Sequence, residues 1–211
     1  MFIRTESFKE FLRFYPIVSI IIAINLLVWM IYKLALWFHI PHIAEYIVFW
    51  GFGSNFRVQA YHEWYRVITP IFTHFDFSHV FFNSFSIFLF APALESLLGK
   101  WKFIVAYLGS GIISNVLQYF FADISLQYIG ASGAIFGLFG IFLFIITLRK
   151  HLLDKGSRQM ILVILILNVA WTLFFPSNID ILGHLFGLLA GFVLGPILLF
   201  RNRGSYYYRP R

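Results

Sequence analysis

A few polar side chains interrupt the apolar segments of this sequence, and their types could do chemistry. Ser132 stands among small residues in the stretch Gly130-Ala131-Ser132-Gly133, and His184 lies at the start of a later apolar run. His79 and Asn83 are four residues apart, so on a helix both side chains occupy one face. A serine next to a histidine base can act as a nucleophile, and histidine and asparagine can donate hydrogen bonds to a developing oxyanion.

Each of these residues also has a structural use that the residue types leave open. Ser132 at the start of a helix could cap it by accepting a backbone N–H, or could place a nucleophile where free N–H groups and the helix dipole favour negative charge. His79 and Asn83 could bind a neighbouring helix, as isolated polar groups in membrane bundles often do. His184 could serve as a base, a metal ligand or a proton relay.

Three histidines make a metal site the rival chemistry. His74, His79 and His184 could supply three nitrogens to a zinc ion. No carboxylate stands at ligand spacing beside them within an apolar segment, and the H-E-x-x-H pattern is absent. We therefore expect neither a metal nor a cofactor.

The composition says which elements must position these side chains. The 211 residues are 60% hydrophobic and 12% charged, where soluble domains carry about 25% charged residues. The sequence predicts an all-α polytopic membrane protein, a single domain over residues 1–211 with short tails at about 1–15 and 201–211. Six spans are expected at about 17–36, 79–98, 103–121, 132–148, 160–175 and 181–200, the fifth being short and ended by Pro176. The first span is expected to be retained, because no small-residue cleavage site precedes it.

The net charge of +7 does not indicate a nucleic-acid partner, because the basic residues stand at the ends of apolar runs. With the N-terminus inside, all 16 Lys and Arg residues except Lys33, Arg57 and Arg66 fall in cytoplasmic segments. The positive-inside rule then predicts that both termini are cytoplasmic. Ser132 and His184 would then both lie near the outer face, at the starts of their spans. There is no cysteine, hence no disulfide and no thiolate metal site.

Small residues and aromatics complete the pattern. Gly183, Gly187, Gly191 and Gly195 recur every fourth residue, and with Gly137 and Gly140 they predict a close approach of the fourth and sixth spans. The segment 37–73 is long, aromatic and without an obvious period. We expect it to be ordered and to lie at the membrane interface.

These residues together resemble the rhomboid family of intramembrane serine proteases, in its bacterial six-span form. The family's GxSG stands as Gly130 to Gly133, its H-x-x-x-N as His79 to Asn83, and its last histidine as His184, followed by Gly187 and Gly191. The resemblance covers about residues 62–195. It departs at Tyr65-Arg66, where the family has Trp-Arg, and at Phe136, where many members have tyrosine.

The resemblance implies a Ser132–His184 dyad, with Phe136 stacked on the histidine. It implies an oxyanion site made by the Ser132 N–H with His79 and Asn83, and room for a substrate backbone beside Gly130 and Gly133. The expected partners are the lipid bilayer and single-span membrane proteins. The latter would be the substrates, cleaved near the outer face of a bacterial plasma membrane. The family's proposed route for lateral entry of the substrate is the fifth span.

Two other functions remain open on the sequence. One is a non-catalytic protein of the same fold that binds and escorts membrane helices, in which the polar set serves packing. The other is a small transporter or channel, which would need an intramembrane carboxylate. Glu95, near the cytoplasmic end of the second span, is the candidate for that role.

Overall fold

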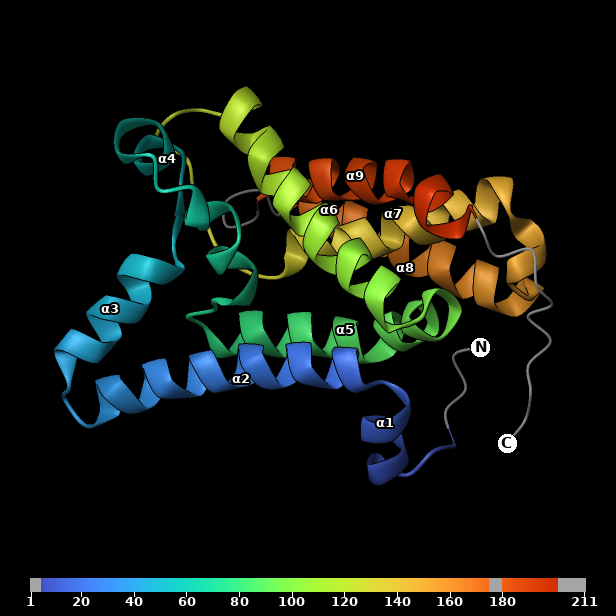
Figure 1. Cartoon of the computed structure of the whole chain (residues 1–211), viewed down its shortest axis with the longest axis horizontal. Coiled ribbons are helices and arrows are strands. Elements are labelled where there is room, and N and C mark those ends of the chain that lie inside the picture. The colour runs from blue at the N-terminus through green and yellow to red at the C-terminus, as the bar shows by residue number, and fades with distance from the viewer. Residues whose placement is uncertain (1–4, 175–179, 201–211) are drawn as a thin grey trace.

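The computed structural model describes residues 5–174 and 180–200, and the described chain is mostly helical (Figure 1). The helices are α1 (Phe8–Phe14), α2 (Pro16–Trp37), α3 (Pro41–Gly51), α4 (Asn55–Tyr61), α5 (Phe77–Leu98), α6 (Lys100–Phe121), α7 (Ser132–Leu148), α8 (Lys155–Phe174) and α9 (Ile181–Leu199). Short 3-10 turns cover Trp64–Val67, Thr69–Phe72 and Lys150–Leu152. Two short strands, β1 (Gly53–Ser54) and β2 (Gln127–Tyr128), pair antiparallel.

Each predicted span corresponds to one helix, which confirms the all-α polytopic fold. By length and composition α2, α5, α6 and α9 can cross a membrane, while α7 is apolar but has 17 residues. The third and fifth spans start earlier than predicted, at Lys100 and Lys155, because polar residues extend the first turns of α6 and α8. The predicted end of the fifth span at Pro176 lies outside the described residues.

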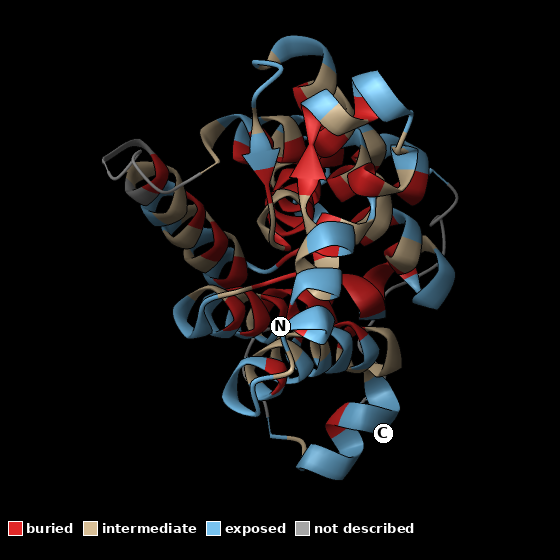
Figure 2. Ribbon diagram, turned by 90° about the vertical axis from the view of Figure 1, so that its left-hand side faces the viewer, coloured by how far each residue is buried: buried red, intermediate tan, exposed pale blue. Residues whose placement is uncertain are grey.

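Helix α7 lies at the centre of the bundle. Its most extensive contact is with α9, and it also packs against α6 and α5. Nearly all of its residues from Ala134 to Ile146 are buried, and buried residues gather in the middle of the molecule in Figure 2. Helices α2 and α5 run side by side, on the side of α7 away from α9 (Figure 1). The first residue of α7, Ser132, is therefore held by the best-packed element of the fold.

Glycines set the spacing of α7 and α9. A Cβ on Gly187 would overlap the carbonyl oxygen of Gly133, and one on Gly191 would overlap that of Gly137. On the other helix, a Cβ on Gly140 would overlap the carbonyl oxygen of Leu188. The predicted close approach of these two helices is confirmed.

The segment 37–73 contains regular elements that its sequence does not reveal, namely α3, β1, α4 and two 3-10 turns. Their short lengths leave no long hydrophobic period to recognise. Arg66, 1% exposed, fastens the segment: its Nη1 donates to the carbonyl oxygens of Phe49 and Phe52 at 2.7 and 2.6 Å, and its Nε to Glu63 at 2.5 Å. The β1–β2 pair then ties this segment to the residues that precede Ser132.

Candidate active site

Ser132 is the first residue of α7 and does not cap it. The N-cap is Ala131, and no side chain caps this helix end. The amide of Ile135 binds the carbonyl of Ala131 at 3.0 Å, so the backbone N–H of Ser132 lies in the open first turn of the helix. Among the described residues the Ser132 hydroxyl makes no hydrogen bond, and the residue is half-buried. The structure therefore does not use Ser132 as a helix cap, which was one of the two roles left open by the sequence.

His184 is positioned against the same face of α7. Its ring stacks on Phe136, with centroids 4.1 Å apart and planes 10° apart. Phe136 follows Ser132 by one helical turn, so both side chains point to one face of α7. His184 is 9% exposed and sits in the first turn of α9, next to Gly183. Among the described residues no hydrogen bond joins Ser132 and His184, whose ring contacts Phe136 and Thr172 instead. Such catalytic hydrogen bonds often form only when substrate binds.

One ring nitrogen of His184, Nδ1, has a partner that the sequence did not indicate. Nδ1 lies 2.9 Å from Oγ1 of Thr172, which is buried on α8. Asp180 is the acidic residue nearest to His184 in the sequence, but it has another task. It is the N-cap of α9, where its Oδ1 accepts from the amide of Gly183 at 2.8 Å. Burial raises the pKa of Asp180, partly offset by this hydrogen bond.

His79 and Asn83 converge on the backbone just before Ser132. Gly130 has φ +103°, and a Cβ there would overlap His79 Nε2 and lie 3.6 Å from Asn83 Nδ2. The amide of Gly130 donates to the carbonyl of Pro70 at 2.9 Å, which fixes this turn. Two side-chain donors from α5 thus meet the N-terminal end of α7 within two residues of the hydroxyl.

His74, one of the three candidate metal ligands of the sequence, belongs to this cluster. Its Nε2 accepts from Asn83 Nδ2 at 3.1 Å and from the amide of Ala131 at 3.3 Å. Burial, helped by the nearby ring of His79, lowers the pKa of His74 to about 3, so the ring is neutral and Nε2 can accept. One N–H of the Asn83 amide is thereby fixed, and the other is directed away from His74. Its place five residues before His79 is the signal that could have found it.

Gly133 packs between helices in the structure. A Cβ there would lie 3.1 Å from Oγ of Ser114 and 3.6 Å from the carbonyl oxygen of Gly183. Ser114 in turn donates to that carbonyl at 2.7 Å. The side of Gly133 where a Cβ would stand therefore faces α6 and α9, and there the glycine serves the contact between helices.

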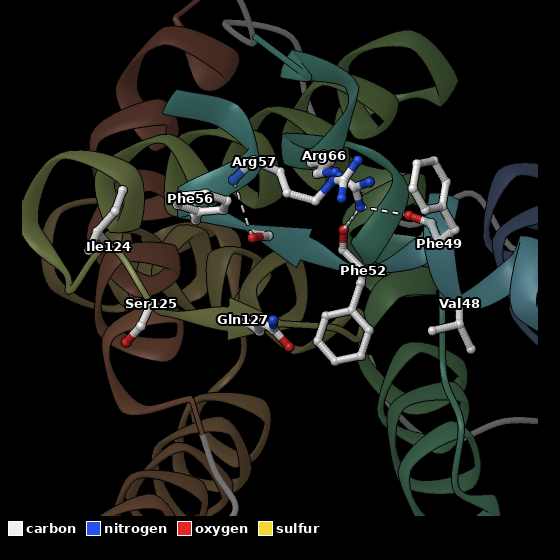
Figure 3. Close-up of a pocket in the computed structure, with 10 residues that line it drawn as sticks. Val48, Phe49, Phe52, Phe56, Arg57, Arg66, Ile124, Ser125 and Gln127 are labelled. Carbon is white, nitrogen blue, oxygen red and sulfur yellow. Dashed lines mark hydrogen bonds between the residues drawn. The ribbon is translucent and has the colours of Figure 1, made fainter. Parts of the chain in front are cut away.

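A pocket of about 570 Å³ lies elsewhere, between the segment 37–73 and β2 (Figure 3). Phe49, Phe52, Arg57, Arg66 and Gln127 are among its lining residues. It includes none of Ser132, His184, His79 and Asn83. In Figure 3 the guanidinium of Arg66 points to the carbonyls of Phe49 and Phe52, so its charge is used to hold the loop.

The three histidines of the rival metal hypothesis do not form a ligand set. His74 and His79 have ring centroids 4.9 Å apart in an edge-to-face contact, while His184 stacks on Phe136. Among the described residues no group of three or more His, Asp or Glu side chains is arranged to hold an ion. Glu95 is committed too: its two carboxylate oxygens accept from the amides of Ile17 and Val18 at 3.1 and 2.9 Å. It stabilises the start of α2, so it offers no open carboxylate to a transport pathway.

Known proteins of similar sequence indicate the family of this chain. The family model "Rhomboid domain" matches residues 61–201. The chain is 44% identical over 98% of its length to the whole of "Putative rhomboid protease YdcA" of Bacillus subtilis (strain 168). It is 32% identical to "Rhomboid protease GluP" of the same organism over 77% of this chain and 31% of that protein, and 33% identical to "Rhomboid-like protease 1" of Toxoplasma gondii over 84% of this chain and 62% of that protein. The chain therefore belongs to the rhomboid family and is an integral membrane protein, a rhomboid-type serine protease.

Proposed function

We propose that this protein cuts single-span membrane proteins near the outer face of a bacterial plasma membrane with a Ser132–His184 dyad. The observation that carries the proposal is the placement of His184 by Phe136 on the face of α7 that begins with Ser132. The proposed topology has both termini in the cytoplasm and residues 1–211 in one membrane domain, in line with the distribution of Lys and Arg.

In the proposed reaction the Ser132 hydroxyl attacks the scissile carbonyl carbon while His184 Nε2 takes its proton. The carbonyl oxygen becomes an oxyanion, which the Ser132 N–H, His79 and Asn83 stabilise. Collapse of this intermediate breaks the C–N bond, and His184 returns the proton to the leaving amine. Water, with His184 again as base, then hydrolyses the acyl-enzyme and frees Ser132.

The positions of the donors support their proposed roles. His79 and Asn83 reach the backbone at Gly130, two residues before the nucleophile. His79, Gly130 and Ser132 are half-buried, whereas His74 behind them is fully buried. A substrate can thus reach the half-buried residues of the cluster, while the buried His74 holds them in place.

Labelling with a fluorophosphonate tests the proposal without knowledge of the natural substrate. Purified wild type in detergent should be labelled, and Ser132→Ala and His184→Ala should lose both labelling and cleavage of a single-span reporter. Ser125→Ala is the matched control, because Ser125 is exposed and its hydroxyl bonds the carboxylate of Asp123. A folded wild type that resists the reagent would contradict the proposal.

Cleavage of the single-span reporter also distinguishes the protease from the non-catalytic alternative. A protein that only binds membrane helices would retain its client in pull-downs after Ser132→Ala, as the wild type does, and neither would release a cleavage product. We favour the protease, because a packing role does not require Ser132 to remain without a hydrogen-bond partner beside a stacked histidine.

A further inference from the structure

Thr172 of α8 has a position that the proposed dyad does not explain. It is 4% exposed on a helix that otherwise contacts mainly α7, and its hydroxyl lies 2.9 Å from His184 Nδ1 on α9. A buried threonine that only filled space would be replaceable by valine. The hydroxyl instead meets the one ring nitrogen of His184 that faces away from the serine in the proposed dyad.

The direction of this hydrogen bond follows from the second contact of Thr172. Oγ1 also lies 2.8 Å from the carbonyl oxygen of Asn168, one turn earlier in α8. A carbonyl can only accept, so the single hydroxyl proton points to Asn168. The lone pairs of Oγ1 then face His184, and the proton on the imidazole must be on Nδ1.

We propose that Thr172 is a positioning residue that fixes His184 in the tautomer required of a general base, with Nδ1 protonated and the lone pair of Nε2 toward Ser132. In triad proteases a buried aspartate does this task, and the wrong tautomer there costs about 10⁴ in rate. Here a neutral hydroxyl does it, and Phe136 holds the plane of the ring from the other side. The aspartate closest in the sequence, Asp180, is occupied as the N-cap of α9.

In this assignment, residues of three helices position the proposed base His184. Ser132 and Phe136 are on α7, His184 is on α9, and the acceptor for Nδ1 is on α8. The orientation of His184 therefore depends on the seating of α8. This inference rests on the proposed function, since it assigns a role to a residue that acts through the proposed base.

The test compares Thr172→Val, which removes the acceptor at constant shape, with Thr172→Ser, which keeps it. We expect Thr172→Val to lower the second-order rate of fluorophosphonate labelling and kcat roughly tenfold, the value of one ordinary hydrogen bond, with KM unchanged. Thr172→Ser should stay within about twofold of wild type. Thr147→Val is the control, because Thr147 also bonds carbonyls of its own helix but is exposed at the far end of α7.

A second measurement reads the tautomer directly. In ¹⁵N-histidine-labelled protein, the His184 resonances, assigned by their loss in His184→Gln, should be those of the Nδ1–H form. In Thr172→Val, or in Thr172→Ala should valine not fold, the Nε2–H form should appear. An Nε2–H tautomer in wild type, or equal labelling of wild type and Thr172→Val, would overturn the inference. Absence of labelling in wild type would instead overturn the proposed dyad and leave the tautomer measurement as an independent test of Thr172.

Discussion

Gly137 of α7 and Gly191 of α9 meet backbone to backbone, so closely that a Cβ on Gly191 would overlap the carbonyl oxygen of Gly137. The obstacle is main chain, which cannot swing aside as a side chain could. The contact lies one turn further into the bundle than Gly133 and Gly187, which meet in the same way next to Ser132 and His184. The glycines therefore determine how closely the helix of the serine approaches the helix of the histidine.

Gly191→Ala should lower the thermal unfolding temperature in detergent and reduce cleavage together. Overpacking of this kind costs about 1–3 kcal/mol, and here the backbones of two helices must move apart. Gly109→Ala on α6 is the control, because its Cβ would make ordinary contacts, at 3.5 Å with Leu194 of α9 and at 3.9 Å with Val105 of α6. That variant should be neutral or more stable by up to about 1 kcal/mol, as expected for alanine within a helix. Equal melting of the two variants would contradict the role assigned to Gly191.

The sequence predicted the helices, and it singled out His79, Asn83, Ser132 and His184, because each leaves a local mark. Long apolar runs mark the spans, and polar residues within them are costly enough to be noticed. It did not predict Thr172 as a partner of His184 or Glu95 as a cap for α2, because these contacts join residues far apart in the chain. The short elements of residues 37–73 were missed for another reason, since one or two turns leave no detectable period.

Gly130→Ala should abolish most activity while the protein remains folded. The residue has φ +103°, where a side chain is strained, and the added methyl would push His79 away from the oxyanion position. Gly99 is a matched control, with φ +78° and nothing within 4 Å of an added Cβ. Gly99→Ala should lose stability from backbone strain but keep its activity per folded molecule. Melting curves and labelling rates of both variants distinguish strain from displacement of the donors.

Asn83→Ala and His74→Ala should differ in degree. Loss of one oxyanion donor typically lowers kcat by about 10²–10³, which is the expectation for Asn83→Ala. His74 acts through Asn83 and the amide of Ala131, so its loss should cost less in kcat and more in stability. Cleavage kinetics with a single-span reporter measure both. A larger kcat effect at His74 would show that the direct donor role belongs elsewhere.

Glu95→Gln should destabilise the packing of α2 without touching the chemistry. The carboxylate accepts from two amides at the start of α2, and an amide side chain would turn an NH₂ group toward one of them. We expect a loss of about 1–3 kcal/mol, as for a charged acceptor at buried donors. Exposed Glu45 provides the control in Glu45→Gln, which should melt as wild type does. Labelling per folded molecule should be equal in all three proteins.

The ion pairs of Glu63 make the stability of the 37–73 segment depend on pH. Its hydrogen bond with Arg57, and then that with the buried Arg66, lower the pKa of Glu63 from 4.5 to about 2. A carboxyl whose pKa is lower in the folded state stabilises it above the unfolded value, and that contribution is lost as the pH falls from 4.5 toward 2. Glu63→Gln should therefore melt well below wild type at pH 7, because Arg66 is left buried beside a neutral group. The difference should shrink below pH 4.5 and nearly vanish near pH 2, where the protonated carboxyl resembles the amide. Melting of both proteins in detergent at pH 7, 5, 4 and 3 measures this, and a difference that stays constant across the series would show that Glu63 acts by packing rather than by charge.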